Sequence, residues 1–85
     1  MENYKVTFVR SSQKELDTLP SELVARIVAQ LEGLRENPFA HGVIKLKGYE
    51  AYRVRVGDYR VIFQVDTQAR VMRILQIVHR GDAYR

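Results

Sequence analysis

Hydrophobic and polar residues alternate on both sides of the dipeptide Gly57-Asp58. A period of two is typical of a β-strand with one buried face, and a two-residue loop that begins with glycine is typical of a hairpin with a type II′ turn. The pattern therefore predicts two antiparallel strands joined at this dipeptide. Because residues that face each other across a ladder point to the same side of the sheet, one side is apolar and consists of Tyr52, Val54, Val56, Tyr59, Val61 and Phe63.

The opposite side of this hairpin carries three arginines, Arg53, Arg55 and Arg60, with Arg55 directly opposite Arg60. Like charges in such a pair are unfavourable by roughly 0.2–1 kcal/mol, so folding does not require them there. One explanation is that the outer face of a half-exposed sheet must be polar, and arginine is a common way to fill it. The other is an anionic partner, because a guanidinium can hold a phosphate through paired hydrogen bonds. Three arginines on one face favour the anionic partner.

Two helices are expected after a first strand at residues 4–9. The first helix begins near Ser12, where Glu15 stands at the spacing of a capping box, and it ends before Pro20. Proline is also well placed in the first turn of the second helix. That helix ends at Asn37-Pro38 and carries one apolar stripe that faces a core, made of Leu23, Val24, Ile27, Val28, Leu31 and Leu34.

The remaining segments complete a fold prediction. Residues 39–50 contain two glycines and are expected to form a loop with at most a short extended piece. Residues 71–79 are apolar almost throughout, which predicts a central strand covered on both faces. The order β-α-α-β-β-β predicts a single domain (1–85) of the α+β class, with a helical hairpin packed on one face of a small, mainly antiparallel four-stranded sheet. The arginine face would remain open.

Composition narrows the class of protein. Hydrophobic residues make up 46% of the 85 residues and charged residues 28%, as in ordinary globular domains. The absence of cysteine fits a reducing compartment, and the sequence begins without the pattern of a signal peptide, so we expect a cytoplasmic protein that does not meet a membrane. Residues 1–44 hold five basic and six acidic side chains, whereas residues 45–85 hold nine basic and four acidic ones. This asymmetry indicates that one end of the molecule meets nucleic acid or an acidic protein.

Groups suited to proton transfer occur near the end of the sequence. Histidine is the side chain type best suited to moving protons near neutral pH, which makes His79 a candidate, and the hydroxyl of Tyr84 can move a proton if nearby cations lower its pKa. The alternative is that His79, Arg80 and Tyr84 are incidental polar residues of a frayed terminus. No role is expected for His41, and two distant histidines without cysteine do not predict a metal site.

With these residues in place, the chain resembles the toxins of the RelE/ParE superfamily from type II toxin–antitoxin pairs, over nearly its full length. The resemblance is strongest in the hairpin and in the closing segment, and it includes Leu19-Pro20, Glu36-Asn37-Pro38, Lys45-Leu46-Lys47-Gly48 and residues 79–85. The RelE-like branch implies the RelE-like microbial RNase fold and a metal-independent endoribonuclease without a cofactor. It also implies cleavage of mRNA in the ribosomal A site and neutralisation by a cognate antitoxin protein.

The resemblance also assigns roles to residues. The basic pair of the family falls on Arg53 and Arg55, and its next arginine falls on Arg60. Its terminal positions fall on His79, Arg80 and Tyr84, and the basic step before the hairpin places Lys45 and Lys47 against RNA. Arginine seldom gives up a proton, so the arginines suit charge stabilisation, and His79 and Tyr84 are the better acid–base candidates. Where family members carry lysines, this chain has arginines at positions 53 and 55, so a lysine-like base is not expected there. The ParE branch shares the fold but acts on DNA gyrase without cleaving RNA, and it is the alternative function.

Overall fold

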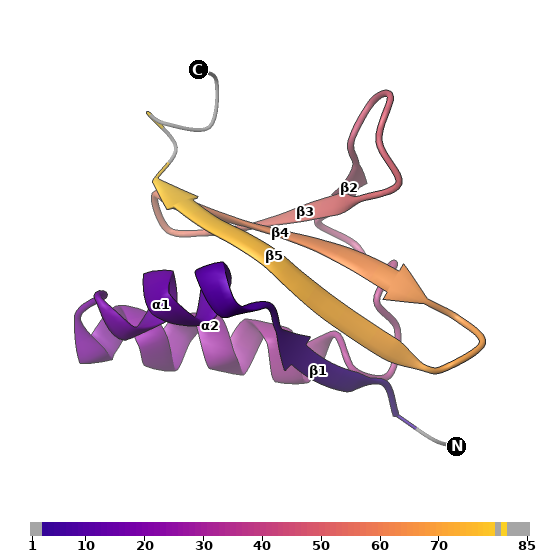
Figure 1. Ribbon diagram of the computed structural model, residues 1–85, viewed down its shortest axis with the longest axis horizontal. Helices are drawn as coiled ribbons and strands as arrows, with labels where there is room; N and C mark the ends of the chain where they lie inside the picture. Colours follow the sequence, from indigo (N-terminus) through magenta and orange to yellow (C-terminus); the bar gives the residue numbers. More distant parts are fainter. Residues whose placement is uncertain (1–2, 80, 82–85) are drawn as a thin grey trace.

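The computed structural model describes residues 3–79 and 81. One sheet of five strands, in the order β1-β5-β4-β3-β2, is covered on one face by two helices (Figure 1). The first strand is parallel to β5, and the other neighbours are antiparallel. The α+β class and the one-sided helical layer agree with the sequence prediction. The elements are β1 (Lys5–Phe8), α1 (Arg10–Asp17), α2 (Ser21–Gly33), β2 (Val43–Lys45), β3 (Tyr52–Val56), β4 (Tyr59–Asp66) and β5 (Val71–His79).

The predicted hairpin is confirmed in its register. Val56 pairs with Tyr59, and Arg55 pairs with Arg60. Gly57 has a φ of 59°, and the φ of Asp58 is not positive, which is the signature of a type II′ rather than a type I′ turn. The apolar side packs on the helices, and four of its six side chains are buried: Val54, Val56, Val61 and Phe63.

The sheet has five strands where the sequence predicted four. The additional strand, β2, is three residues long and pairs with β3, so that Val43 lies opposite Val54. It lies in the segment for which a loop with a short extended piece was expected. A three-residue strand next to Gly42 has no periodicity of its own, and only its hydrogen bonds to β3 define it.

The two helices meet the sheet through the predicted stripe. Pro20 precedes the first residue of α2, and its carbonyl accepts hydrogen bonds from the amides of Leu23 and Val24. The stripe is buried at Ile27, Leu31 and Leu34, whereas Val28 is exposed. Within residues 3–79 and 81, no helix is long and apolar enough to cross a membrane.

The predicted capping box is wrong. The first helix begins at Arg10, with no side-chain hydrogen bond at its N-cap. Ser12 is instead fully buried inside the helix, where its Oγ lies 2.7 Å from the carbonyl oxygen of Ile74. Glu15 reaches the same strand, and its Oε1 accepts a 2.9 Å hydrogen bond from the amide of Ile77. Ser12 therefore bonds to the backbone of β5 at the residue opposite the end of β1, and Glu15 bonds to it three residues farther on, where β1 no longer reaches.

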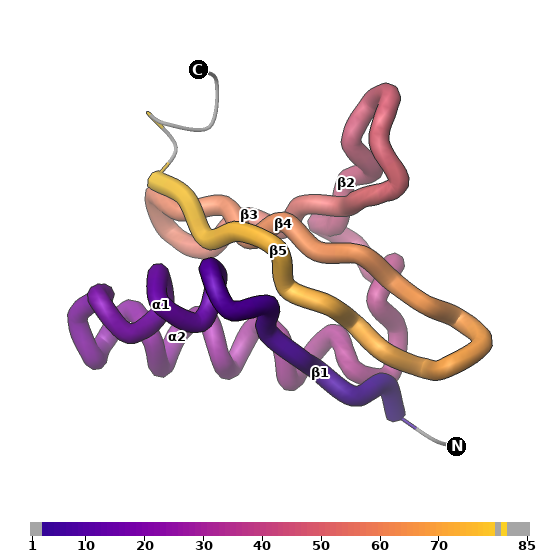
Figure 2. Tube along the Cα trace, in the orientation of Figure 1, coloured from indigo at the N-terminus to yellow at the C-terminus, as the bar shows by residue number. Residues whose placement is uncertain are grey.

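The last strand is central, as predicted, but only one of its faces is covered. It lies between β1 and β4, and Arg73 and Gln76 are exposed on the face away from the helices. The register against β4 shifts within β5, because Ile62 pairs with Gln76 and the next residue, Phe63, pairs with Ile74. Leu75 is therefore the extra residue of a β-bulge, and Figure 2 shows the bend in the trace of β5.

Candidate nucleic-acid interface

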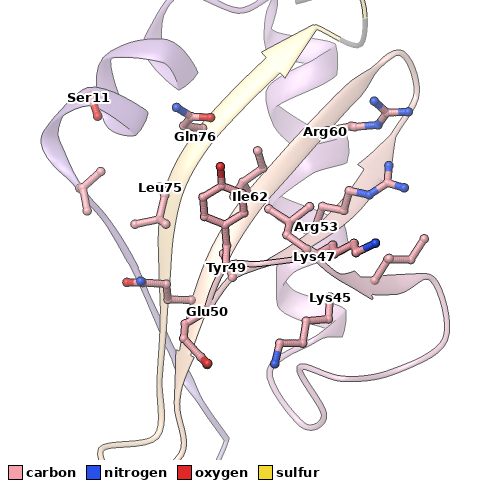
Figure 3. A pocket seen from close by; sticks show the side chains of 15 residues that line it. Ser11, Lys45, Lys47, Tyr49, Glu50, Arg53, Arg60, Ile62, Leu75 and Gln76 are labelled. Atoms are coloured by element: carbon pink, nitrogen blue, oxygen red, sulfur yellow. The ribbon is translucent and has the colours of Figure 1, made fainter. Parts of the chain in front are cut away.

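The face of the sheet opposite the helices contains a concavity of about 980 Å³. The start of α1, the four strands β2 to β5 and the turn between β2 and β3 all contribute to it (Figure 3). Its lining residues are Val9, Ser11, Ile44, Lys45, Leu46, Lys47, Tyr49, Glu50, Ala51, Arg53, Arg60, Ile62, Gln64, Leu75 and Gln76.

Four cations line this concavity on one side. Lys45 ends β2 and Lys47 follows it, while Arg53 and Arg60 project from β3 and β4. We call these four residues the cationic wall. Figure 3 shows that their side chains lie on the same side of the concavity. Among the described residues that line it, Glu50 is the one acidic residue. Four positive charges against one negative charge favour an anionic ligand.

Arg55 belongs to the same face but lies outside the lining of the concavity. It pairs with Arg60 across the β3–β4 ladder, it is exposed, and its Nε donates a 3.2 Å hydrogen bond to the carbonyl of Gly57. This bond directs the guanidinium group toward the hairpin turn. Arg53 and Arg60 are therefore brought together in the concavity, and Arg55 stands beside it.

The bulge in β5 forms part of the concavity. Met72 and Ile74 are buried toward the helices before the bulge, and Ile77 is buried toward them after it. As a result, the two consecutive side chains between them, Leu75 and Gln76, both line the open face. Leu75 forms an apolar floor together with Ile62 of β4, while Gln76 and Ser11 provide a neutral polar rim across from the cationic wall (Figure 3).

His79 lies on the other face of the sheet. It pairs with Tyr59, one of the apolar residues of the hairpin that face the helices, and the two rings meet edge to face with centroids 5.3 Å apart. His79 does not line the concavity. Arg80 and Tyr84 lie outside the described residues, so their predicted roles remain predictions.

Sequence reasoning missed the neutral half of this site. Tyr49, Ile62, Leu75 and Gln76 were assigned no role, although all four line the concavity. The signal for Tyr49 was present, because an aromatic residue next to the Lys47-Gly48 step is typical of nucleic-acid surfaces that combine stacking with charge. Ile62 could also have been placed on the open face, because the predicted register sets it opposite Arg53. Leu75 and Gln76 could not be found, because the bulge decides which residues of β5 face outward.

Among residues 3–79 and 81, histidines and carboxylates do not gather in groups of three that could hold a metal ion. The groups that the described part of the site offers are its cations, its apolar floor and its neutral polar rim.

The chain matches known proteins over most of its length. The sequence model of the family described as "ParE toxin of type II toxin-antitoxin system, parDE" matches residues 6–84. The toxin RelE3 of Methanocaldococcus jannaschii is 31% identical over 85 residues, covering 94% of each chain. The toxin RelG of Mycobacterium tuberculosis is 29% identical over 84 residues, covering 96% of this chain and 97% of RelG. The toxin in the archaeal RelE–RelB complex of Pyrococcus horikoshii superposes with a TM-score of 0.82 at 34% identity, covering 95% of this chain and 99% of that one. The chain belongs to the RelE/ParE superfamily and is a toxin of the type II toxin–antitoxin class.

Proposed function

We propose that this toxin is a ribosome-dependent endoribonuclease that cuts mRNA in the A site and so stops translation. The observation that carries the proposal is the cationic wall, in which three neighbouring strands and one turn direct Lys45, Lys47, Arg53 and Arg60 into one concavity. The RelE names of its relatives support the same activity. A ribosomal target implies that the toxin acts in the cytoplasm.

The proposed reaction needs charge stabilisation more than any other contribution. The 2′-oxygen of a ribose attacks the neighbouring phosphorus and loses its proton, the bond from phosphorus to the 5′-oxygen breaks, and that oxygen gains a proton. Negative charge builds on the phosphoryl oxygens between these events. Arg53 and Arg60 are the cations of the hairpin that share the concavity, so they suit the reacting phosphate. Lys45 and Lys47 suit the RNA backbone on either side. Four fixed cations can supply this charge without a metal ion or a cofactor.

The proton-transfer role is best assigned to Tyr84. Of the two acid–base candidates, His79 packs against Tyr59 on the face that carries the helices, away from Arg53 and Arg60. Arg55 would contribute further positive charge at the hairpin end of the site, and Arg80 keeps the charge-stabilising role that the family resemblance implies. This assignment keeps all the predicted residues in the proposal but moves His79 from a chemical role to a structural one.

The small site also explains why a ribosome would be required. Four cations and a short apolar floor offer few groups that could bind and orient a flexible RNA unaided. A ribosome that already holds the codon supplies that orientation. The conformational entropy of the mRNA is then lost before the toxin binds, so the toxin does not have to offset it.

A cognate antitoxin is the second proposed partner. Solved structures similar to this chain include toxins in complex with RelB antitoxins, among them that of Pyrococcus horikoshii. We propose that an acidic or amphipathic segment of this chain's antitoxin covers the cationic wall or distorts it. Charge neutralisation of this kind weakens with salt, because exposed charges are screened over about 10 Å at 0.1 M ionic strength.

The alternative function is inhibition of DNA gyrase without RNA cleavage. One observation favours it, namely that the family whose sequence model matches residues 6–84 is described as ParE. The relatives named RelE at 30–34% identity favour the ribosome instead.

Expression of the chain in a translation extract, followed by primer extension on a defined mRNA, separates these functions. We expect translation to stop and new 5′ ends to appear within the coding sequence only when ribosomes are present. Intact mRNA together with inhibited gyrase supercoiling would assign the chain to the ParE function. Efficient cutting of the same mRNA without ribosomes would overturn the claim of ribosome dependence.

A further inference from the structure

Tyr49 is the most exposed large hydrophobic side chain among the described residues, at 70%. It nevertheless stands on an ordered turn. Its amide donates a 3.3 Å hydrogen bond to the carbonyl of Leu46, and the amide of Leu46 donates a 2.9 Å bond to Ala51. Gly48 has a φ of 81°, as the third residue of a type II turn requires. The backbone therefore presents the tyrosine at a fixed place.

Folding gives no reason for an aromatic residue at this position. Tyr49 lies outside the hydrophobic core and the residues packed against it. Its side chain makes no hydrogen bond and no ring contact with the described part of the chain. An exposed aromatic ring held by a tight turn, without packing partners, is a feature of binding surfaces.

The ring of Tyr49 extends from the turn into the concavity (Figure 3). The apolar floor of Ile62 and Leu75 lines the same concavity, and the amide of Gln76 stands at its neutral rim. The cationic wall lies on the other side. A ligand that fits this arrangement is planar and apolar on its faces, carries hydrogen-bonding groups on its edge, and is joined to an anion.

We propose that Tyr49, Ile62 and Leu75 form a subsite for one unpaired nucleobase of the RNA, while the cationic wall holds the adjoining phosphates. An unpaired base can stack on an aromatic ring, and the edge of that base can be read by side-chain amides. The subsite rests on the proposed function, since it names how the RNA is held at that same site. Tyr49 acts here as a positioning residue, and Gln76 is placed to influence which base is preferred.

The test measures binding rather than cleavage. The folded wild-type chain is titrated with a tetranucleotide of 2′-O-methyl adenosine, which cannot be cut at the 2′-oxygen, and with a sugar–phosphate tetramer of the same charge that lacks the bases. Binding is followed by the NMR signals of the protein. We expect the adenosine tetramer to bind more tightly, with the ring protons of Tyr49 shifted upfield by the stacked base.

Variants at position 49 then assign the difference to the ring. Tyr49→Leu should weaken binding of the adenosine tetramer by about 10-fold, within the range known for stacking on aromatic side chains, and leave the base-free tetramer unchanged. Tyr49→Phe should bind both as the wild type does. Val28→Ala, which removes an exposed apolar side chain of α2 outside the lining of the concavity, is the matched control and should retain the full preference for bases.

Several results would overturn the subsite. Equal binding of the two tetramers, no binding of either by the wild type, or an unchanged preference in Tyr49→Leu would each do so. The proposed function can fail independently. If the chain prefers the adenosine tetramer through Tyr49 but leaves mRNA intact on ribosomes, the subsite stands and the endoribonuclease assignment falls.

Discussion

His79 lies directly opposite Tyr59 across the β4–β5 ladder, and their rings meet edge to face at an angle of 87°. The pair lies at the end of the β4–β5 ladder, on the face of the sheet that carries the helices. Arg60, the neighbour of Tyr59 in the sequence, points to the other side, where it lines the concavity. Two neighbouring residues of β4 therefore lie on opposite faces of the sheet: Tyr59 packs against His79, and Arg60 belongs to the candidate site.

The first prediction follows from this separation. We expect His79→Ala to retain nearly the full rate of mRNA cleavage, because its ring contacts Tyr59 and not the concavity. Loss of the ring contact at this exposed position should cost at most about 1 kcal/mol of stability. Single-turnover cleavage on programmed ribosomes and urea unfolding measure the two effects. A folded His79→Ala protein that no longer cuts mRNA would show that His79 takes part in proton transfer.

Arg60→Ala should abolish toxicity and leave the protein folded. The guanidinium lines the concavity at the proposed reacting phosphate, and loss of such a preorganised contact lowers rates by about 10²–10³. Its removal also relieves repulsion with Arg55 across the ladder, so the melting temperature should change little.

Arg73→Ala is the control for Arg60→Ala. Arg73 pairs with Gln64, a residue of the open face, but does not line the concavity. Growth arrest, cleavage rate and circular dichroism should all match the wild type for this variant. If both arginines proved equally necessary, cleavage would depend on overall charge, and the cationic wall would lose its specific role.

Tyr84→Phe tests the proposed proton transfer, because it keeps the ring and removes only the hydroxyl. We expect ribosome binding to persist while single-turnover cleavage falls by about 10²–10⁴, the range typical of a general acid or base. Tyr84→Ala, which also removes the ring, distinguishes proton transfer by the hydroxyl from stacking of the ring on a base. Normal cutting by Tyr84→Phe with a defect in Tyr84→Ala would indicate stacking on a base instead.

Glu15→Ala should destabilise the fold. Its carboxylate accepts the amide of Ile77, just past the β-bulge, and hydrogen bonds to charged groups are worth about 1.5–3 kcal/mol. Glu15→Gln keeps an acceptor oxygen and should lose less. Urea unfolding measures both, with the exposed Glu36→Ala as control. Equal stability of all three variants would show that water replaces the carboxylate without cost.

The sequence predicted the hairpin correctly because the signals that define a hairpin lie within the hairpin itself. Alternation and a glycine at the turn fix the pairing of Arg55 with Arg60 without reference to the rest of the chain. The presence of two helices was predicted for the same reason, since proline and an apolar stripe mark them, but the second helix ends at Gly33 and not at Asn37-Pro38 as expected. Two of the four residues of the cationic wall were placed on the open face in the same way, because Arg53 and Arg60 belong to that hairpin.

What could not be predicted depends on partners far away in the sequence. Ser12 and Glu15 have the spacing of a capping box, but each is hydrogen-bonded to a residue 62 positions away. The face of His79 depends on the bulge. Strict alternation from Ile74 would place His79 beside the arginines, and one extra residue at Leu75 turns it to the other side.

The interior strand β5, which joins β1 to the rest of the sheet, is also the last strand of the described residues in chain order, and this has a consequence for biosynthesis. Residues Val71–His79 pair on one side with β1, more than 60 residues earlier, and contribute Met72, Ile74 and Ile77 to the core. A nascent chain that ends before β5 contains every residue of the cationic wall but cannot build the sheet that positions it. Unfinished chains should therefore be harmless to the ribosomes that make them, and toxicity should begin only when β5 is in place.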